Sequence, residues 1–162
     1  MRTCMRILPA LAFGFLMFAP VWAQKYNGPR PPKADVLYLV HADNLIPTET
    51  AEATEDSKKN EVTYSIPGTS SPARTPLAEP IFIIQTNKIQ PDRLELYKMD
   101  VKNGRRVVSV TKNRRGSAKP YHLQVTKLDS NLYRVEASEV LENGAYSISP
   151  SDSNLVFCFE EY

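Results

Sequence analysis

The chain has 162 residues, of which 42% are hydrophobic, and it carries 20 Lys and Arg against 18 Asp and Glu. This length is enough for one domain with its own core and too short for two of ordinary size. The small net charge of +2 gives no reason to expect nucleic acid or an anionic surface as a partner.

The first 23 residues are typical of an export signal. A positively charged start, an apolar stretch and a small-residue cleavage site are supplied by Arg2 and Arg6, residues 7–19, and Val21 to Ala23. A membrane anchor is the alternative, but the apolar run is short for a span of roughly 20 residues. We therefore expect export to the periplasm or the outside of the cell, with no membrane-spanning segment after cleavage.

Cleavage after Ala23 would change the composition of the protein. It removes two arginines and no acid, so 18 basic residues would face 18 acidic ones and the mature chain would be neutral. It also removes Cys4, which leaves Cys158 as the single cysteine among the remaining 139 residues. An intrachain disulfide is then excluded by count.

Residues 24–34 are rich in proline and have no apolar periodicity, which predicts a flexible arm. The domain is expected over residues 35–162. There the apolar runs are short, rich in Val, Ile, Tyr, Phe and Thr, and separated by turn residues. This pattern predicts an all-β domain, a single antiparallel β-sandwich of about eight or nine strands.

The amino-terminal half supplies three of these strands, at residues 35–42, 61–67 and 81–86. The last of them, IFIIQT, is apolar on both faces and is therefore expected to be central or well covered. Residues 45–60 are compatible with a short helix, but their Thr content favours one arm of a hairpin that closes near Lys58 to Asn60. The segment 68–80 is expected to be a loop because it is rich in proline and small residues.

The carboxy-terminal half contains two predicted hairpins. In the first, residues 93–111, Asn103-Gly104 suits the centre of a type I′ turn, so Lys102 should face Arg105. This register places Met99, Val108, Tyr97 and Val110 on one face and Leu96 and Val107 on the other. In the second hairpin, strands at residues 121–128 and 132–137 are joined by Asp129 to Asn131, and Tyr121, Leu123 and Val125 share one face.

The segment LENGAYSISP combines an apolar residue, the turn pair Asn143-Gly144 and Tyr146 at the start of a strand. It resembles the L-x-P-G-x-Y corner of immunoglobulin-like and transthyretin-like β-sandwiches, with Asn143 where proline is commoner. The resemblance implies that the Tyr146 ring packs in the core and that its hydroxyl bonds to nearby backbone. The mature chain as a whole also resembles a group of exported bacterial proteins, a likeness that implies no activity.

Catalytic signatures are missing from the sequence, which has no G-x-S-x-G, H-E-x-x-H or C-x-x-C motif and no phosphate-binding glycine loop. His41, His122 and Cys158 could make a three-ligand metal site, but each falls on a different predicted strand without the close spacing typical of zinc. A nucleophile in the 68–80 loop, at Ser70, Ser71 or Thr75, is as weakly indicated. We expect no catalytic residues, no metal and no cofactor.

The most localised signal is positive charge, because residues 98–119 contain eight Lys and Arg and one acid, Asp100. This basic hairpin end could bind an acidic ligand such as a polyanionic glycan. The alternative is a solvated rim whose charges discourage pairing of strand edges. Aromatic residues are not interleaved with the charges, so nucleic acid is not expected. The candidate binding residues are Arg105, Arg106, Lys112, Arg114, Arg115 and Lys119.

The terminal segment NLVFCFEEY places Cys158 on a strand whose other face carries Leu155, Phe157 and Phe159. The phenylalanines should take the core, which makes Cys158 a covered structural cysteine first and an intermolecular disulfide second.

These patterns favour an exported, non-catalytic binding or structural module, whose partner is an unknown protein or glycan of the cell envelope. Acidic residues concentrate away from the basic segment, so self-association into a homo-oligomer is a further hypothesis. The alternative function is a small hydrolase-like or metal-dependent enzyme with a dispersed site.

Overall fold

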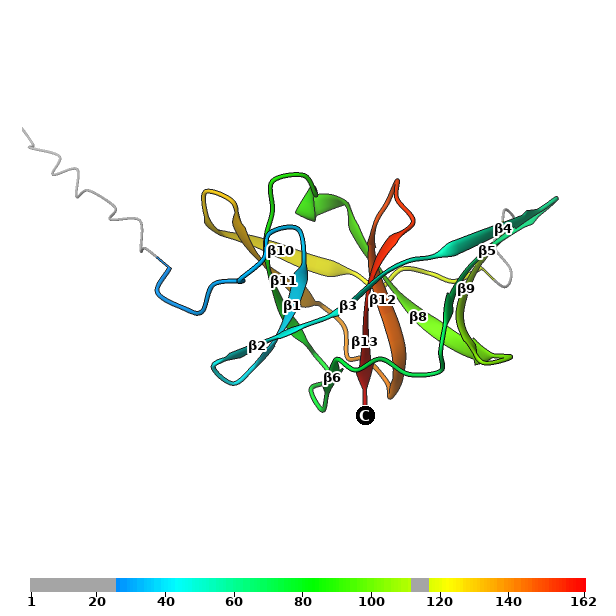
Figure 1. Ribbon diagram of the computed structural model, residues 1–162, viewed down its shortest axis with the longest axis horizontal. Helices are drawn as coiled ribbons and strands as arrows, with labels where there is room; N and C mark the ends of the chain where they lie inside the picture. The colour runs from blue at the N-terminus through cyan, green and yellow to red at the C-terminus, as the bar shows by residue number, and fades with distance from the viewer. Residues whose placement is uncertain (1–25, 112–116) are drawn as a thin grey trace, which may run out of the picture.

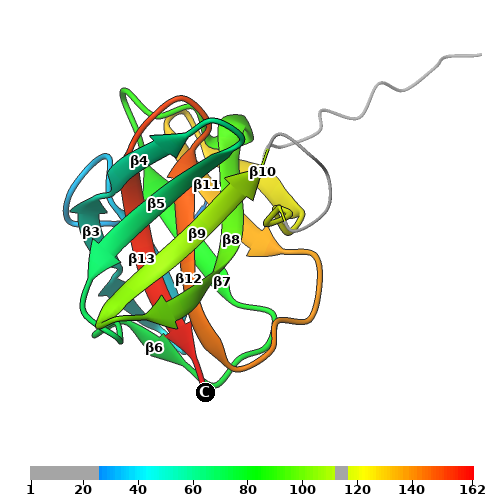
Figure 2. The same cartoon turned by 90° about the vertical axis from the view of Figure 1, so that its right-hand side faces the viewer.

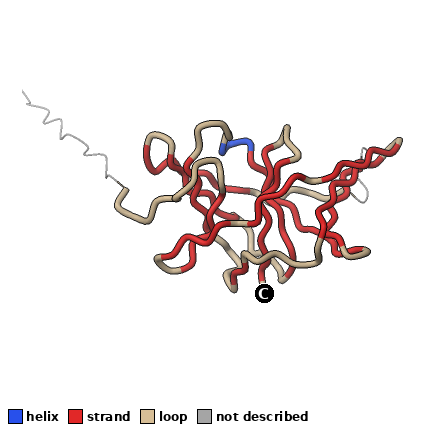
Figure 3. Tube along the Cα trace, viewed as in Figure 1, coloured by secondary structure: helices blue, strands red, loops and turns tan. Residues whose placement is uncertain are grey.

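The computed structural model describes residues 26–111 and 117–162. Strands account for nearly all of the regular structure, and the one helical element in these residues is a 3-10 turn at Pro91–Arg93 (Figure 3). Thirteen strands form two sheets that pack as a sandwich (Figure 1). The predicted all-β sandwich is therefore confirmed.

The first sheet has five strands, all antiparallel, in the order β10-β11-β7-β1-β2. Their bounds are β10 Leu123–Asp129, β11 Leu132–Ala137, β7 Ile81–Gln85, β1 Leu37–His41 and β2 Asn44–Pro47. The predicted central strand is β7, which lies between β11 and β1 and whose Phe82 and Ile84 are fully buried.

The second sheet has the order β3-β13-β12-β8-β9-β5-β4, with β6 added in parallel at the end of β13. Its strands are β3 Glu49–Glu52, β13 Leu155–Glu161, β12 Gly144–Pro150, β8 Leu94–Lys102, β9 Arg105–Thr111, β5 Glu61–Pro67, β4 Thr54–Lys58 and β6 Arg74–Thr75. The strands at the two ends of this order, β3 and β4, are separated in the chain by Ala53 alone. The sheet therefore curls over itself, and Figure 2 shows β4, β5 and β9 lying in front of β13 and β12.

Each face of the middle strands β8, β12 and β13 has its own core, because side chains alternate along a strand. The first core lies between the two sheets and includes Leu96, Tyr146, Ile148, Phe157 and Phe159, packed on residues of β1, β7 and β11. The second core lies inside the curl. Its buried members are Ala53, Ile66, Met99, Val108, Ala145, Val156 and Cys158.

The hairpins follow the sequence pattern closely. Asn103 and Gly104 both have positive φ, and Lys102 pairs with Arg105, as the type I′ turn requires. Residues 45–60 form strands, and β4 and β5 make the expected hairpin with its turn at Lys59-Asn60. The strand number exceeds eight or nine because residues 44–58 form three short strands and the 68–80 loop contributes β6.

The tyrosine corner is also formed. Tyr146 is fully buried, and its hydroxyl donates a hydrogen bond to the carbonyl oxygen of Glu142 at 2.7 Å. The ring stacks on Phe159 with centroids 5.4 Å apart, so this residue joins the turn before β12 to the first core.

Residues 26–34 of the predicted arm have no regular structure, but they contact the domain. Pro31 is buried, and the Arg30 guanidinium pairs with the Asp129 carboxylate at 2.5 Å. The predicted export signal lies outside the described residues. In the part of the chain that is described, no helix has the length and hydrophobicity needed to cross a membrane.

Candidate functional site

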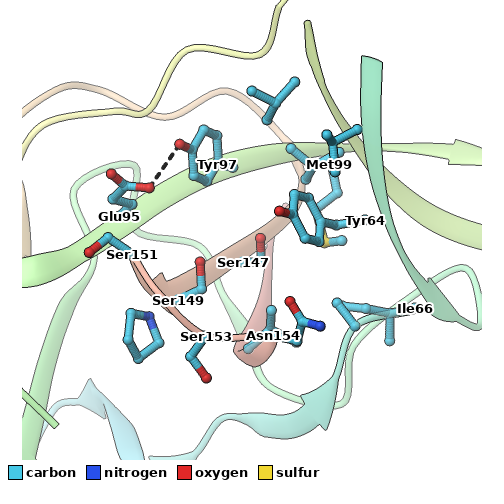
Figure 4. A pocket seen from close by; sticks show the side chains of 16 residues that line it. Tyr64, Ile66, Glu95, Tyr97, Met99, Ser147, Ser149, Ser151, Ser153 and Asn154 are labelled. Carbon is cyan, nitrogen blue, oxygen red and sulfur yellow. Dashed lines mark hydrogen bonds between the residues drawn. The ribbon is translucent and has the colours of Figure 1, made fainter. Parts of the chain in front are cut away.

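A cavity of about 250 Å³ lies inside the curl of the second sheet, between β8 and β12 on one side and β5 and β9 on the other (Figure 4). Its inner end is formed by Met99 and Val108, which are buried. Its outer end is formed by exposed residues of the turn between β12 and β13. The cavity therefore opens at that turn and closes towards Met99.

One wall of the cavity is apolar, and strand alternation explains why. Every second residue of β5 and of β9 points into the curl. These residues are Val62, Tyr64, Ile66, Val108 and Val110, and three further apolar residues outside β5 and β9 also line the cavity: Met99, Val156 and Ala53.

The opposite wall is polar, because β12 and the turn after it place hydroxyl groups along the cavity. They belong to Ser147, Ser149, Ser151 and Ser153, followed by the amide of Asn154. Ser147 lies deepest, with only 3% of the residue exposed. Its hydroxyl makes no hydrogen bond to the described part of the chain and is reached from the cavity, since it is not among the fully enclosed polar atoms. This hydroxyl is free to bind a molecule that enters the cavity.

A carboxylate and a phenol stand beside the serines, on the same face of β8. The Tyr97 hydroxyl donates a hydrogen bond to the carboxylate of Glu95 at 2.9 Å. Burial and this carboxylate raise the pKa of Tyr97 to about 12, with a smaller contribution from neighbouring Tyr64. Tyr97 therefore stays protonated at neutral pH, and its oxygen keeps a lone pair with which it can accept a bond.

A different part of the second sheet contains an ion pair between Arg106 of β9 and Glu49 of β3, next to the end of β5. The Arg106 side chain is 1% exposed and donates to both carboxylate oxygens of Glu49, at 2.6 and 2.8 Å. It also donates to the carbonyl oxygens of Pro67 and Gly68. Hydrogen bonds from Arg106 lower the pKa of Glu49 against the opposing effect of burial.

The buried thiol of Cys158 is near this ion pair. Burial raises the pKa of Cys158 to about 12, although the charge of Arg106 acts in the opposite direction. The side chain is fully buried, as expected of a structural cysteine. A thiol in this state is a poor nucleophile because almost none of it is ionised at neutral pH.

The structure separates the basic residues that the sequence grouped. Arg106 is buried and bound to Glu49, so it is unavailable to an external acidic ligand. Arg105 donates to the Ser65 hydroxyl at 3.2 and 3.0 Å. Lys119 is exposed beside an open depression that is lined by the acids Glu61, Asp100 and Glu139 as well as by lysines. Lys112, Arg114 and Arg115 lie outside the described residues.

The other candidate groups are not brought together. His41 and His122 are exposed whereas Cys158 is buried, and the described residues contain no group of three or more His, Cys, Asp or Glu suited to a metal. Ser70 is exposed in the 68–80 loop. In the same loop, Ser71 donates to the carbonyl of Cys158, and the hydroxyl of Thr75 accepts from the Leu77 amide.

Sequence reasoning missed the cavity residues Glu95, Tyr97 and Ser147 as a site. The available signal was the repeated serine in YSISPSDSN, which places hydroxyls on the face of β12 opposite Tyr146 and Ile148. In comparisons with known proteins, the chain matches no family model, no curated protein and no solved structure.

Proposed function

We propose that this protein is an exported, non-catalytic binding module that holds a small amphipathic molecule in the cavity of its second sheet. The observation that carries the proposal is the Ser147 hydroxyl, which belongs to a buried residue that lines the cavity and makes no hydrogen bond to the described residues. This hydroxyl can bond to water or to a polar group of a ligand that enters the cavity.

The size and chemistry of the cavity define the class of ligand. An engineered protein cavity of about 150 Å³ holds one benzene molecule. In proportion, 250 Å³ accommodates a ligand body of about ten non-hydrogen atoms. The apolar wall suits a hydrocarbon body, and the serine wall suits a group that forms hydrogen bonds.

Binding without catalysis is supported by the titratable groups of the cavity lining. Among the described lining residues these are Glu95, Tyr64 and Tyr97. No histidine or cysteine lines the cavity with them, so the serines have no histidine to activate a hydroxyl as a nucleophile, and the nearby Glu95 carboxylate already accepts a bond from Tyr97. Export, to the periplasm or beyond the cell, is part of the proposal and rests on the character of residues 1–23.

The test uses 1-octanol, a neutral probe of about the expected size, titrated into the purified protein by calorimetry and by NMR. We expect saturable binding, with amide shifts confined to β5, β8, β9, β12, the turn after β12 and the start of β13. In the variant Val110→Phe a ring occupies part of the cavity, and octanol binding should weaken about tenfold or more because the ligand and the ring compete for the same volume.

The matched control is Val107→Phe, which makes the same change on the opposite face of β9. Octanol binding should stay within about twofold of the wild-type value, since Val107 does not line the cavity. Far-UV circular dichroism checks that both variants are folded. Failure of octanol to bind, or equal binding to both variants, would refute the proposal.

A further inference from the structure

The charge that lines the cavity is negative. Glu95 is the single charged side chain among the lining residues that the structure describes, and it stands at the open end beside Ser149 and Ser151. One of its oxygens accepts the bond from Tyr97. The other oxygen has no side-chain partner in the described chain and is available to a ligand.

Hydrogen-bond acceptors gather around this carboxylate. Tyr97 has already used its proton on Glu95, so towards a ligand its oxygen can only accept. The hydroxyl oxygens of Ser147 and Ser149 can accept as well. An ammonium group, which has three donors and no acceptor, satisfies such a set, whereas a carboxylate or phosphate would face the charge of Glu95 without a counter-charge.

The aromatic residues favour the same ligand. Tyr64 and Tyr97 both line the cavity, and they are close enough to influence each other electrostatically. The faces of aromatic rings attract cations, and proteins recognise quaternary ammonium ligands with cages of aromatic side chains.

The apolar part of the cavity fixes the orientation of the ligand. Along β8, Met99 lies four residues beyond Glu95, a distance of roughly 13 Å at the usual rise of a strand. An ammonium group at Glu95 therefore places a hydrocarbon chain along Tyr97 and towards Met99 and Val108.

We infer that the molecule bound in this cavity is an organic cation, an amine with an apolar body whose ammonium group bonds to Glu95, to Tyr97 and to the hydroxyl of Ser149, which is opposite Glu95 on the neighbouring strand. The inference rests on the proposed function and adds the charge and chemical class of the ligand. It is opposite in sign to the acidic ligand that the basic sequence segment suggested.

The experiment compares three probes of equal chain length: octylammonium, 1-octanol and octanoate. Each is titrated into the wild-type protein at pH 7 and low ionic strength. Octylammonium should bind about tenfold more tightly than octanol. Its ammonium group is attracted to the partly buried carboxylate of Glu95, and the neutral hydroxyl of octanol is not. Octanoate should bind more weakly than octanol. Added salt should weaken the binding of octylammonium and leave that of octanol unchanged.

The variant Glu95→Gln isolates the charge. It should lower octylammonium affinity about tenfold towards that of octanol and leave octanol within about twofold, since only the ion pair is removed. The matched control is Glu79→Gln, the same change in an exposed loop away from the lining, which should alter none of the three affinities.

The outcomes separate the inference from the proposed function. If octanol binds in the cavity but the three probes bind equally, or octanoate binds most tightly, the cationic ligand is wrong and the binding module stands. An octylammonium affinity that Glu95→Gln leaves unchanged also overturns the inference. If no probe binds, both the inference and the proposed function fail.

Discussion

Replacing Glu49 with Gln should destabilise the protein through Arg106. The substitution keeps the shape of the side chain and removes the negative charge that faces a guanidinium with only 1% of its side chain exposed. Arg106 stays charged at every accessible pH, so the variant leaves a buried charge without its counter-ion.

The size of the effect follows from the geometry. Breaking a fully buried ion pair by removing one partner costs about 3–5 kcal/mol. Glu49 is 26% exposed and the Gln oxygen still accepts one bond, so we expect a loss of about 2 kcal/mol. For a domain of this size each kcal/mol lowers Tm by about 4 °C, which predicts a decrease of about 8 °C.

Thermal and urea unfolding measure the loss, and Glu52→Gln is the control because Glu52 is an exposed residue of the same strand. The double variant Glu49→Leu with Arg106→Met should unfold within about 1 kcal/mol of wild type, since removing both charges removes the desolvation cost as well. The carbonyls of Pro67 and Gly68 belong to exposed residues and can then bond to water. The reasoning is refuted if Glu49→Gln costs less than about 0.5 kcal/mol, or if the double variant is the less stable of the two.

The ion pair also predicts the pH dependence of stability. The pKa of Glu49 is lower in the folded protein than in the unfolded chain. The stabilisation that ionised Glu49 provides is therefore fully present above about pH 4.3, the pKa of Glu in the unfolded chain. It is lost as the pH falls through the lower pKa of Glu49 in the folded protein. The difference in stability between wild type and Glu49→Gln should be constant from pH 6 to 8 and shrink below about pH 4.

Three further measurements test local features of the fold. Tyr146→Phe removes the hydrogen bond to the Glu142 carbonyl and should cost about 1 kcal/mol in urea unfolding; no change would mean that the corner is not stabilising. Cys158, fully buried with its pKa raised to about 12, should react with a thiol reagent only at the rate of unfolding; rapid labelling of the native protein would contradict this. Gly104→Ala should cost about 1 kcal/mol because the φ of Gly104 is +73° and an added Cβ meets no atom within 4 Å, so a larger loss would point to a steric cause.

Local sequence determined the strands and their faces, because alternation and turn residues act over a few positions. The Asn103-Gly104 turn set the register of its hairpin, and the alternation in LVFCFEE assigned Phe157 and Phe159 to one core and Cys158 to the opposite face. The tyrosine corner at Tyr146 was likewise contained within six residues.

The tertiary structure alone decided which residues pack against each face of these strands. Arg106 belongs to a basic segment of the sequence, yet it is buried because the curl of the second sheet brings Glu49, 57 residues away, against its guanidinium. The cavity has the same origin, since Tyr64, Glu95 and Ser147 belong to three strands that are far apart in the sequence. Pairing between distant strands depends on how whole sheets bury their apolar faces, and short-range patterns carry no information about it.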